Sequence, residues 1–211
     1  MGTFDELGAG SLSICVFCGA RPGSSPAAVA AARELGEAIA FGGHRLVYGA
    51  GGVGLMAETA QAAAAAGAQV TGIVPRFLYE LERVRAAVAD DLVLTEDMFE
   101  RKRLMIEKSD GFVALPGGYG TLDEVLEVIS LSYLGQCRKP LALVDVGGHW
   151  ESLRTLFADL HARGFTRPGF DTMYRVVGSA ADAIEFLQRH PADLARPSLR
   201  FHDPAVDPAP A

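Results

Sequence analysis

The sequence predicts an α/β protein with a Rossmann-like, doubly wound parallel sheet that carries helices on both faces and forms a single domain. Short apolar runs alternate with longer segments of helical periodicity, which is typical of right-handed βαβ units. The length of 211 residues and the hydrophobic fraction of 49% suffice for one domain with a full core. Three turns after expected strands are rich in glycine, and ligands of such sheets bind at the carboxyl ends of the strands.

In the N-terminal half, the expected elements follow from apolar runs and from the residues that end them. Gly42 and Gly43 stop the first helix, and Gly67 closes an alanine-rich second helix. Pro75 is expected to stop the third strand. For residues 76–90 the pattern does not decide between a short helix and a loop. We therefore expect strands at 12–17, 45–48, 69–74 and 91–95, and helices at 25–41, 54–66 and 98–109.

The C-terminal half continues the alternation. From Pro191 the chain carries five prolines and little periodicity, so residues 1–190 form the expected domain and 191–211 a partly disordered tail. The remaining strands are expected at 111–115, 140–144 and 173–177, and the remaining helices at 121–133, 150–163 and 180–188. In the helix at 121–133 the apolar residues at helical spacing, expected to face the sheet, are Leu122, Val125, Leu126 and Ile129.

The bulk composition limits the classes of partner. The formal net charge of −7 argues against nucleic acid and anionic membranes. No apolar run approaches the roughly 20 residues that span a bilayer, and the first residues lack the pattern of a signal peptide. Three cysteines fit a reduced compartment, and Cys15 and Cys18 fall on opposite faces of an expected strand. We expect a cytoplasmic protein without a metal site or a cofactor.

Gly49, Gly51 and Gly54 follow an expected strand and open an expected helix, as in a dinucleotide-binding fingerprint. That fingerprint also needs an acidic residue at the end of the next strand, to hold the ribose hydroxyls. Here the first acidic residue after that strand is Glu80. The sequence therefore argues against NAD. The glycines are expected to permit a tight turn and close packing, and a phosphate or ribose contact stays open.

The most informative segment is Pro116-Gly117-Gly118-Tyr119-Gly120-Thr121, which joins a buried strand to a helix. Glycines let successive backbone N–H groups approach one anion, and a helix N-terminus adds unpaired donors and partial positive charge. The segment is therefore expected to bind a phosphate despite the acidic net charge. Thr121 and Glu124 also have the spacing of a capping box, and spacing alone leaves both interpretations open.

Three basic residues, Arg101, Lys102 and Arg103, lie in the helix that precedes this segment. A run of basic residues is usually a solvated face, which is the expectation for Arg103. Arg101 and Lys102 come soon after the fourth strand, and therefore at the same edge of the sheet as the glycine segment. An arginine there can meet a phosphate or a carboxylate bidentately, which a lysine cannot do.

Together these motifs resemble the LONELY GUY (LOG) family of cytokinin riboside 5′-monophosphate phosphoribohydrolases, long mislabelled as lysine decarboxylases. The resemblance covers roughly residues 12–190. It implies hydrolysis of an N6-modified adenosine 5′-monophosphate to the free base and ribose 5-phosphate, in a homodimer. The motifs that carry it are Pro116-Gly117-Gly118-Tyr119-Gly120-Thr121-x-x-Glu124, Met98-x-x-Arg101-Lys102, Val16-Phe17-Cys18-Gly19 and Tyr48-Gly49-x-Gly51-x-x-Gly54-Leu55-Met56.

The resemblance also implies roles for individual residues. Arg101 and Glu124 match the family's catalytic pair, and Glu82 loosely matches an upstream acid that contacts the substrate. The implied substrate-binding residues are Glu82, Arg101, Lys102, Gly117, Gly118, Tyr119, Gly120, Thr121, Leu122 and Asp123. The apolar residues of the same helix that are expected to supply part of a dimer interface are Val128, Leu131 and Leu134.

Two departures from the family pattern bear on substrate preference. Ala20-Arg21 stand where the family often has serine, and Ala57 stands where it often has glycine. The alternatives are hydrolysis of AMP or another purine monophosphate, and a non-catalytic carrier of a nucleotide or phosphorylated cofactor. A carrier needs neither Arg101 nor Glu124, which disfavours it. A decarboxylase would need a lysine Schiff base to pyridoxal phosphate, and none of the three lysines has a suitable sequence setting.

Overall fold

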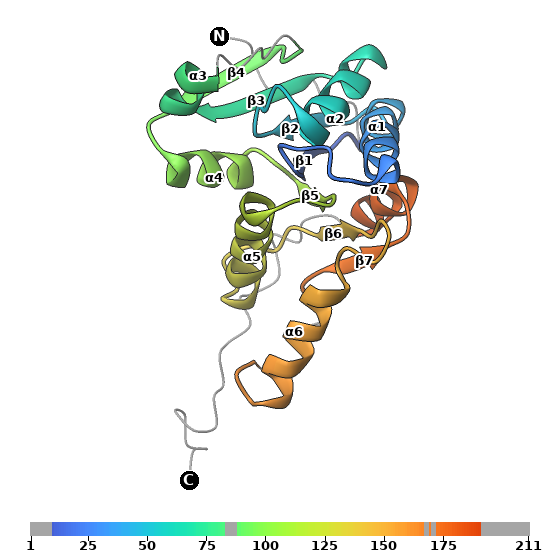
Figure 1. Ribbon diagram of the computed structural model, residues 1–211, viewed down its shortest axis with the longest axis vertical. Helices are drawn as coiled ribbons and strands as arrows, with labels where there is room; N and C mark the ends of the chain where they lie inside the picture. Colours follow the sequence, from blue (N-terminus) through green and yellow to red (C-terminus); the bar gives the residue numbers. More distant parts are fainter. Residues whose placement is uncertain (1–9, 83–87, 167–168, 170–171, 191–211) are drawn as a thin grey trace.

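The computed structural model describes residues 10–82, 88–166, 169 and 172–190. The sheet has seven strands in the order β4-β3-β2-β1-β5-β6-β7, and each neighbouring pair is parallel (Figure 1). The doubly wound α/β prediction is confirmed. The strands are β1 (Ser13–Phe17), β2 (Arg45–Tyr48), β3 (Val70–Pro75), β4 (Asp91–Thr95), β5 (Gly111–Ala114), β6 (Leu141–Val144) and β7 (Arg175–Val177).

The helices form a layer on each side of the sheet (Figure 1). One layer consists of α1, α2 and α7, and the other contains α4, α5 and α6. The helices are α1 (Pro26–Phe41), α2 (Gly54–Ala65), α3 (Arg76–Glu82), α4 (Met98–Glu107), α5 (Tyr119–Tyr133), α6 (Glu151–Ala162) and α7 (Ala180–Arg189). None of the helices in the described ranges is long and apolar enough to cross a membrane.

Each face of the sheet has its own apolar core, because successive strand residues point to opposite faces. In β1, Ile14 and Val16 pack with the layer of α1, α2 and α7, whereas Cys15 and Phe17 pack with α4, α5 and α6. Cys18 lies in the first core and Cys15 in the second, both as buried free thiols. The expectation that these two cysteines face opposite sides is confirmed.

The strand order creates the position for a ligand site. From β1 the chain builds outward through β2 and β3 to β4, and then crosses over to place β5 on the other side of β1. The loops after β1 and β5 therefore diverge from adjacent strands, which leaves a crevice at their carboxyl ends. Ile14 and Phe17 of β1 are in register with Gly111 and Ala114 of β5.

Some expected details are wrong. The last helix before β6 begins at Tyr119 and not at Thr121, because Gly118 is its N-cap. Leu126 of that helix is 41% exposed, so it does not face the sheet as expected. Pro75 is the last residue of β3, where it pairs with Thr95, since a proline at a strand end loses only one donor.

Other predictions concern residues outside the described ranges, or residues that were expected at a dimer interface. Residues 76–82 form α3, whereas residues 83–87 and the expected tail at 191–211 lie outside the described residues. Val128 is fully buried in the core, so the expectation that it contributes to a dimer interface is wrong. Leu134, at the end of the same helix, remains 47% exposed.

Candidate active site

Loops after β1, β2, β5 and β6 enclose a cavity of about 660 Å³ at the carboxyl edge of the sheet, a volume typical of small-molecule sites. The backbone N–H of Gly19 donates to the carbonyl of Pro116 at 3.1 Å, and Leu55 N–H donates to the carbonyl of Gly19 at 3.0 Å. The loop after β1 thus bridges the loops after β2 and β5. All three glycine-rich turns identified in the sequence contribute to this one cavity.

All three glycines of the fingerprint-like turn lie where a side chain would collide with a neighbour, and at Gly51 that neighbour is the side chain of Met56. A Cβ at Gly54, whose φ is +66°, would overlap the backbone of Ala20. A Cβ at Gly49 would overlap the guanidinium group of Arg101. These glycines therefore allow close packing, as expected, and one of them makes room for a residue of the predicted catalytic pair.

The start of α4 brings Arg101 to this edge of the sheet. The carboxylate of Asp97, the N-cap, accepts the N–H of Glu100 at 2.8 Å, and the carboxylate of Glu100 accepts the N–H of Glu96 at 2.8 Å. Such reciprocal bonds stabilise the first turn of a helix. Arg101 follows directly after that turn.

The Arg101 side chain joins three separate elements. Its Nε donates to the carbonyl of Ile73 in β3 at 3.2 Å, and its Nη2 donates to the carbonyl of Gly49 at 3.5 Å. Its Nη1 donates to Oε1 of Glu124 on α5 at 3.0 Å. The two side chains are only 9% and 8% exposed, and both line the cavity. The predicted pair is therefore a buried ion pair in the cavity wall.

The environment of Glu124 shifts its acidity toward neutral pH. Burial raises the pKa of its carboxyl group from 4.5 to about 7, because an ionised form loses its hydration. The guanidinium of Arg101 opposes this pKa shift, and the negative charge of Asp123 adds to it. A carboxyl group with such a pKa can both hold and release a proton near pH 7.

The capping-box interpretation of Thr121 and Glu124 is wrong. Because α5 begins after Gly118, Thr121 is the third residue of the helix and Glu124 belongs to its second turn. Glu124 bonds to Arg101, and Thr121 is 3% exposed and lines the cavity. A buried glutamate beside a cavity and without a capping role needs another explanation.

The turn from β5 into α5 brings the N-terminus of a helix to the cavity. A Cβ at Gly117 would overlap the side chain of Thr121, whereas Cβ atoms at Gly118 and Gly120 would meet nothing within 4 Å. The first hydrogen bond of the helix runs from Leu122 N–H to the carbonyl of Gly118 at 3.0 Å. The N–H groups of the first turn lack helical partners, and their residues line the cavity.

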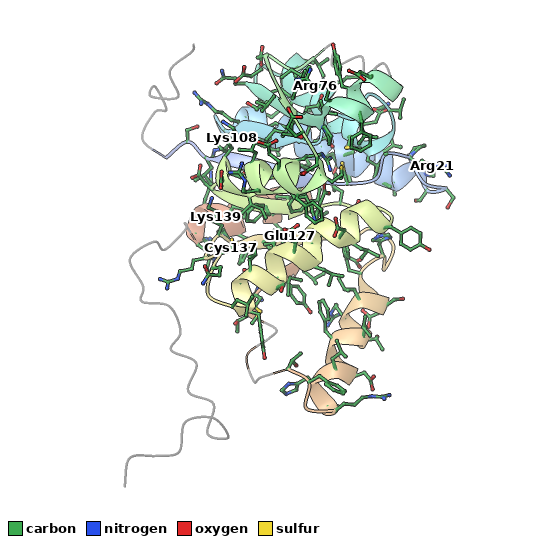
Figure 2. The ribbon with its side chains drawn as sticks, turned by 90° about the vertical axis from the view of Figure 1, so that its left-hand side faces the viewer. Arg21, Arg76, Lys108, Glu127, Cys137 and Lys139 are labelled. Carbon is green, nitrogen blue, oxygen red and sulfur yellow. The ribbon has the colours of Figure 1, made fainter. Side chains whose placement is uncertain are left out.

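Lys102 does not line the cavity. Its ammonium group lies 3.0 Å from Oδ2 of Asp123 and 2.6 Å from Oε2 of Glu127, so it connects α4 to α5. Figure 2 shows Glu127 on α5 where that helix passes α4. Leu122 packs in the core beneath α5 and also lies outside the cavity lining. These contacts hold α4, which carries Arg101, against α5, which carries Glu124.

The remaining predicted residues are distributed as follows. Arg103 is exposed and pairs with Glu107 at 2.9 Å, as expected for a solvated face. Arg21 is exposed on the loop after β1, lines the cavity, and extends from the edge of the molecule in Figure 2. Glu82 is the last residue of α3, and its side chain lies outside the description.

One cavity residue was missed in the sequence. His149, on the loop between β6 and α6, lines the cavity, and its Nε2 accepts the N–H of Gly117 at 3.2 Å. No motif surrounds it, and its proximity depends on β6 lying beside β5. The only available signal was its place in the short connection between an expected strand and an expected helix, between two glycines and a tryptophan.

Comparison with known proteins identifies the family. A family model described as "Possible lysine decarboxylase" matches residues 56–187. The cytokinin riboside 5′-monophosphate phosphoribohydrolase LOG7 of Arabidopsis thaliana is 39% identical over 176 residues, 83% of this chain and 79% of that protein. The chain belongs to the LOG family. Two further members are the enzyme of the same name from Mycobacterium tuberculosis, 38% identical over 83% of this chain and 92% of that one, and the probable enzyme LOGL1 of Oryza sativa subsp. japonica, 40% identical over 83% and 77%.

Solved structures agree with the fold of this LOG family member. A molybdenum cofactor binding protein from Rippkaea orientalis has a TM-score of 0.67 at 23% identity, over 85% of this chain and 96% of that one. A Moco carrier protein from Chlamydomonas reinhardtii has a TM-score of 0.65 at 23% identity, over 85% and 98%. At such identities the likeness concerns the fold alone.

The family model is described as a possible decarboxylase, but no lysine that this chemistry would need lines the cavity. Lys102 pairs with the two carboxylates of α5, and Lys139 donates to the carbonyl of Ile106 at 2.7 Å. Lys108 follows the end of α4. None of the three lines the cavity, and Figure 2 shows Lys108 and Lys139 on the side of the molecule away from Arg21. A Schiff base to pyridoxal phosphate therefore has no lysine to form on there.

Proposed function

We propose that this protein hydrolyses the N-glycosidic bond of an N6-modified adenosine 5′-monophosphate, and so releases the free base and ribose 5-phosphate. The observation that carries the proposal is the buried Arg101–Glu124 pair, which lies in one cavity with the glycine turn at the start of α5. The names of relatives at about 40% identity support the same activity.

In this proposal, the glycine turn binds the phosphate. The amides of Gly118, Tyr119 and Gly120 and the hydroxyl of Thr121 belong to residues that line the cavity, and backbone donors at a helix N-terminus favour an anion. Gly117 completes the turn. Binding energy from the phosphate then orients the ribose and the base, away from the bond that breaks.

The chemistry is assigned to Arg101 and Glu124. Cleavage of an N-glycosidic bond develops positive charge on the sugar, as in other glycoside hydrolyses. The ionised Glu124 carboxylate stabilises that charge and takes a proton from the attacking water as the water oxygen bonds to the sugar carbon. The nitrogen of the released base takes up that proton in turn, and the raised pKa of Glu124, about 7, makes this proton exchange efficient near neutral pH. Arg101 orients the carboxylate through its bond to Oε1.

The contacts of Lys102 and Asp123 support an indirect role in substrate binding. Lys102 bonds Asp123 and Glu127 across the α4–α5 contact, so it sets the position of the helices that carry Arg101 and Glu124. Glu82 retains its assignment as a substrate-contacting acid, from the family pattern. Leu122 supports the helix from the core side.

The apolar part of the cavity suits a base with an apolar substituent. Its side chains come from α1, α2, β3 and α3 and from the loops after β2 and β6: Ala28, Ala50, Leu55, Met56, Val74, Leu78 and Val146. Such a lining rewards an alkyl group on the base by burial. Hydrolysis of AMP or another purine monophosphate is the competing substrate choice, and comparing rates of base release distinguishes the two.

We also propose a cytoplasmic homodimer. The buried free thiols of Cys15, Cys18 and Cys137 support a reducing compartment. Leu126 on α5 and Leu134, the residue that follows its last turn, are 41% and 47% exposed, and exposed apolar side chains on one surface are compatible with a second copy. Mass measurement in solution tests the assembly.

A further inference from the structure

His149 is a cavity residue that the proposed mechanism does not use. It lies on the loop between β6 and α6, and its side chain is exposed. Its Nε2 accepts the N–H of Gly117 at 3.2 Å. Gly117 is the first glycine of the turn that leads into α5, so the imidazole contacts the proposed phosphate-binding segment directly.

The fold holds His149 in this place. Strand β6 lies next to β5, with Leu143 in register with Ala114, so the loops after the two strands leave the sheet side by side. Gly147 and Gly148 have φ values of 64° and 76°, a left-handed conformation that favours glycine and turns the chain sharply. The imidazole is thus presented by a turn that few other sequences can form.

Trp150 anchors the end of that turn. It is 1% exposed, and its indole Nε1 donates to the carbonyl of Val144 at 3.0 Å. Its backbone N–H donates to Oδ1 of Asp145 at 3.1 Å. The ring of His149 meets the Trp150 ring edge-on, with centroids 4.8 Å apart and planes at 88°. One ring edge and one nitrogen of the imidazole are thus both engaged.

The hydrogen bond defines what the imidazole can offer to an anion. An Nε2 that accepts the Gly117 N–H carries a lone pair, so the ring is neutral with its proton on Nδ1. A lone pair repels a phosphate oxygen that approaches the same amide. An imidazolium, by contrast, donates through both nitrogens and attracts a dianion.

We propose that His149 recognises the 5′-phosphate by taking up one proton from solvent on Nε2 when the phosphate binds. Nε2 then gives up the Gly117 N–H, and both groups donate to the phosphate. This inference rests on the proposed function, because it assigns His149 to the phosphate end of the nucleotide. It makes His149 a determinant of affinity for the monophosphate over the riboside. The reacting bond lies elsewhere in the site, so His149 affects KM more than kcat.

Other ionisable groups lie near His149, and the test has to separate their effects from its own. Glu124, with a pKa of about 7, changes charge in the same pH range as a histidine. Glu124 is present both in wild type and in a variant that lacks only the imidazole, so comparison of the two cancels the contribution of Glu124. The other ionisable groups that line the cavity are Cys18, Arg21, Arg101 and Tyr119, and those that flank His149 in the chain are Asp145 and Glu151.

The sharpest test uses sulfate, because it stays a dianion over the whole pH range and adds no ionisation of its own. Its affinity is measured by calorimetry from about pH 5.5 to 8.5, a range wide enough to include the charge change of a histidine side chain. The proteins are wild type, His149→Gln and, as matched control, His190→Gln at the exposed end of α7. Glutamine still offers an oxygen to the Gly117 N–H, so the turn keeps its partner.

Wild type and His190→Gln should lose about tenfold or more in sulfate affinity between pH 6 and 8. His149→Gln should bind sulfate about tenfold more weakly than wild type at pH 6, with a clearly smaller dependence on pH. Equal pH slopes in wild type and His149→Gln would overturn the proposal, as would no sulfate binding by wild type at any pH.

Steady-state kinetics supply an independent readout. With an adenosine monophosphate as substrate, His149→Gln should raise KM about tenfold and leave kcat within about threefold. A fall in kcat at unchanged KM would overturn the assignment to phosphate recognition. If wild type releases no base from any nucleotide, the proposed function fails, and the sulfate titration still decides whether His149 binds the anion.

Discussion

Nη1 of Arg101 on α4 donates to Oε1 of Glu124 on α5 at 3.0 Å, and neither side chain is more than one-tenth exposed. Two further carbonyls, of Ile73 and Gly49, accept from the same guanidinium. The two helices approach at the carboxyl edge of the sheet, where ligands of this fold class bind. A buried pair that faces a cavity is poor evidence for stability alone, and it is well suited to catalysis.

Replacement of Glu124 by glutamine tests the carboxylate itself. Glutamine keeps the shape and an oxygen for Arg101, so the fold should persist while kcat falls by about 10² to 10⁴, the usual worth of one proton-transfer group. Base release and thermal unfolding are measured on the same preparation. Glu107→Gln, which removes only an exposed ion pair with Arg103, should keep activity within about twofold. Full activity in Glu124→Gln would remove the carboxylate from the mechanism.

Arg101→Lys tests the need for a guanidinium. A lysine keeps the positive charge, but its single nitrogen cannot reach Ile73, Gly49 and Glu124 in the planar geometry that arginine offers. We expect kcat/KM to fall by about 100-fold or more, with a folded protein by circular dichroism. Arg103→Lys on the exposed face of α4 is the matched control. Equal activity of the two lysine variants would argue against a specific role for the guanidinium.

Gly49→Ala tests the packing that positions Arg101. The new Cβ would overlap the guanidinium, so the side chain must move and its bond to Glu124 should be lost. Activity is expected to fall by about tenfold or more, since a misplacement of about 1 Å can cost 10²-fold. Gly178→Ala, whose Cβ would meet only Asp182 at 3.7 Å, is the control and should be neutral. Activity near wild type in Gly49→Ala would mean that Arg101 has freedom that the structure does not indicate.

The acidity of Glu124 gives a pH prediction. Its pKa is raised to about 7, so the carboxylate that the mechanism needs is lost as the pH falls through 7. In His149→Gln, where the proposed proton uptake by the imidazole cannot offset the loss, kcat/KM should therefore decrease on the acid side of about pH 7 and approach a tenfold loss per pH unit. A profile of kcat/KM from about pH 5 to 8 checks this. An acid limb near pH 4.5, the ordinary value for a glutamic acid, would contradict the assignment.

Lys102→Met separates helix positioning from direct nucleotide contact. Without the ammonium group, the buried Oε2 of Glu127 loses its counter-ion, which should lower the free energy of unfolding by about 1–3 kcal/mol. The contacts predict a lower Tm and a KM within about threefold of wild type. A KM raised tenfold at an unchanged Tm would instead support a direct contact with the nucleotide.

The sheet and its helices follow from the sequence because strand and helix periods differ and glycines mark the ends. The exact boundaries of the helices were harder to predict from the sequence. Thr121 and Glu124 have the spacing of a capping box, but the N-cap of α5 is Gly118 and the helix begins at Tyr119, two residues before Thr121. Leu126 fits the apolar periodicity, and yet it is exposed, because the buried Glu124 and Thr121 take positions on the inward face that the pattern would give to apolar residues.

The residues of the candidate site that belong to local motifs could be predicted from the sequence. Those that reach the site only because of the order of the strands could not. The glycine turn and the pair of Arg101 and Glu124 come from motifs that adjoin strand ends. The contact of His149 with Gly117 joins residues 32 apart, and it depends on β6 lying next to β5. Lys102 belongs to the same motif as Arg101, but its position on α4 directs its side chain toward Asp123 and Glu127.

Release of free base is the most direct test of the central claim. The purified protein is incubated with isopentenyladenosine 5′-monophosphate, with AMP and with the two matching ribosides, and the liberated base is quantified. Base should appear from the monophosphates and not from the ribosides, faster from the prenylated nucleotide than from AMP. No release from any of them, together with tight binding of a monophosphate by calorimetry, would contradict a hydrolase and favour a carrier.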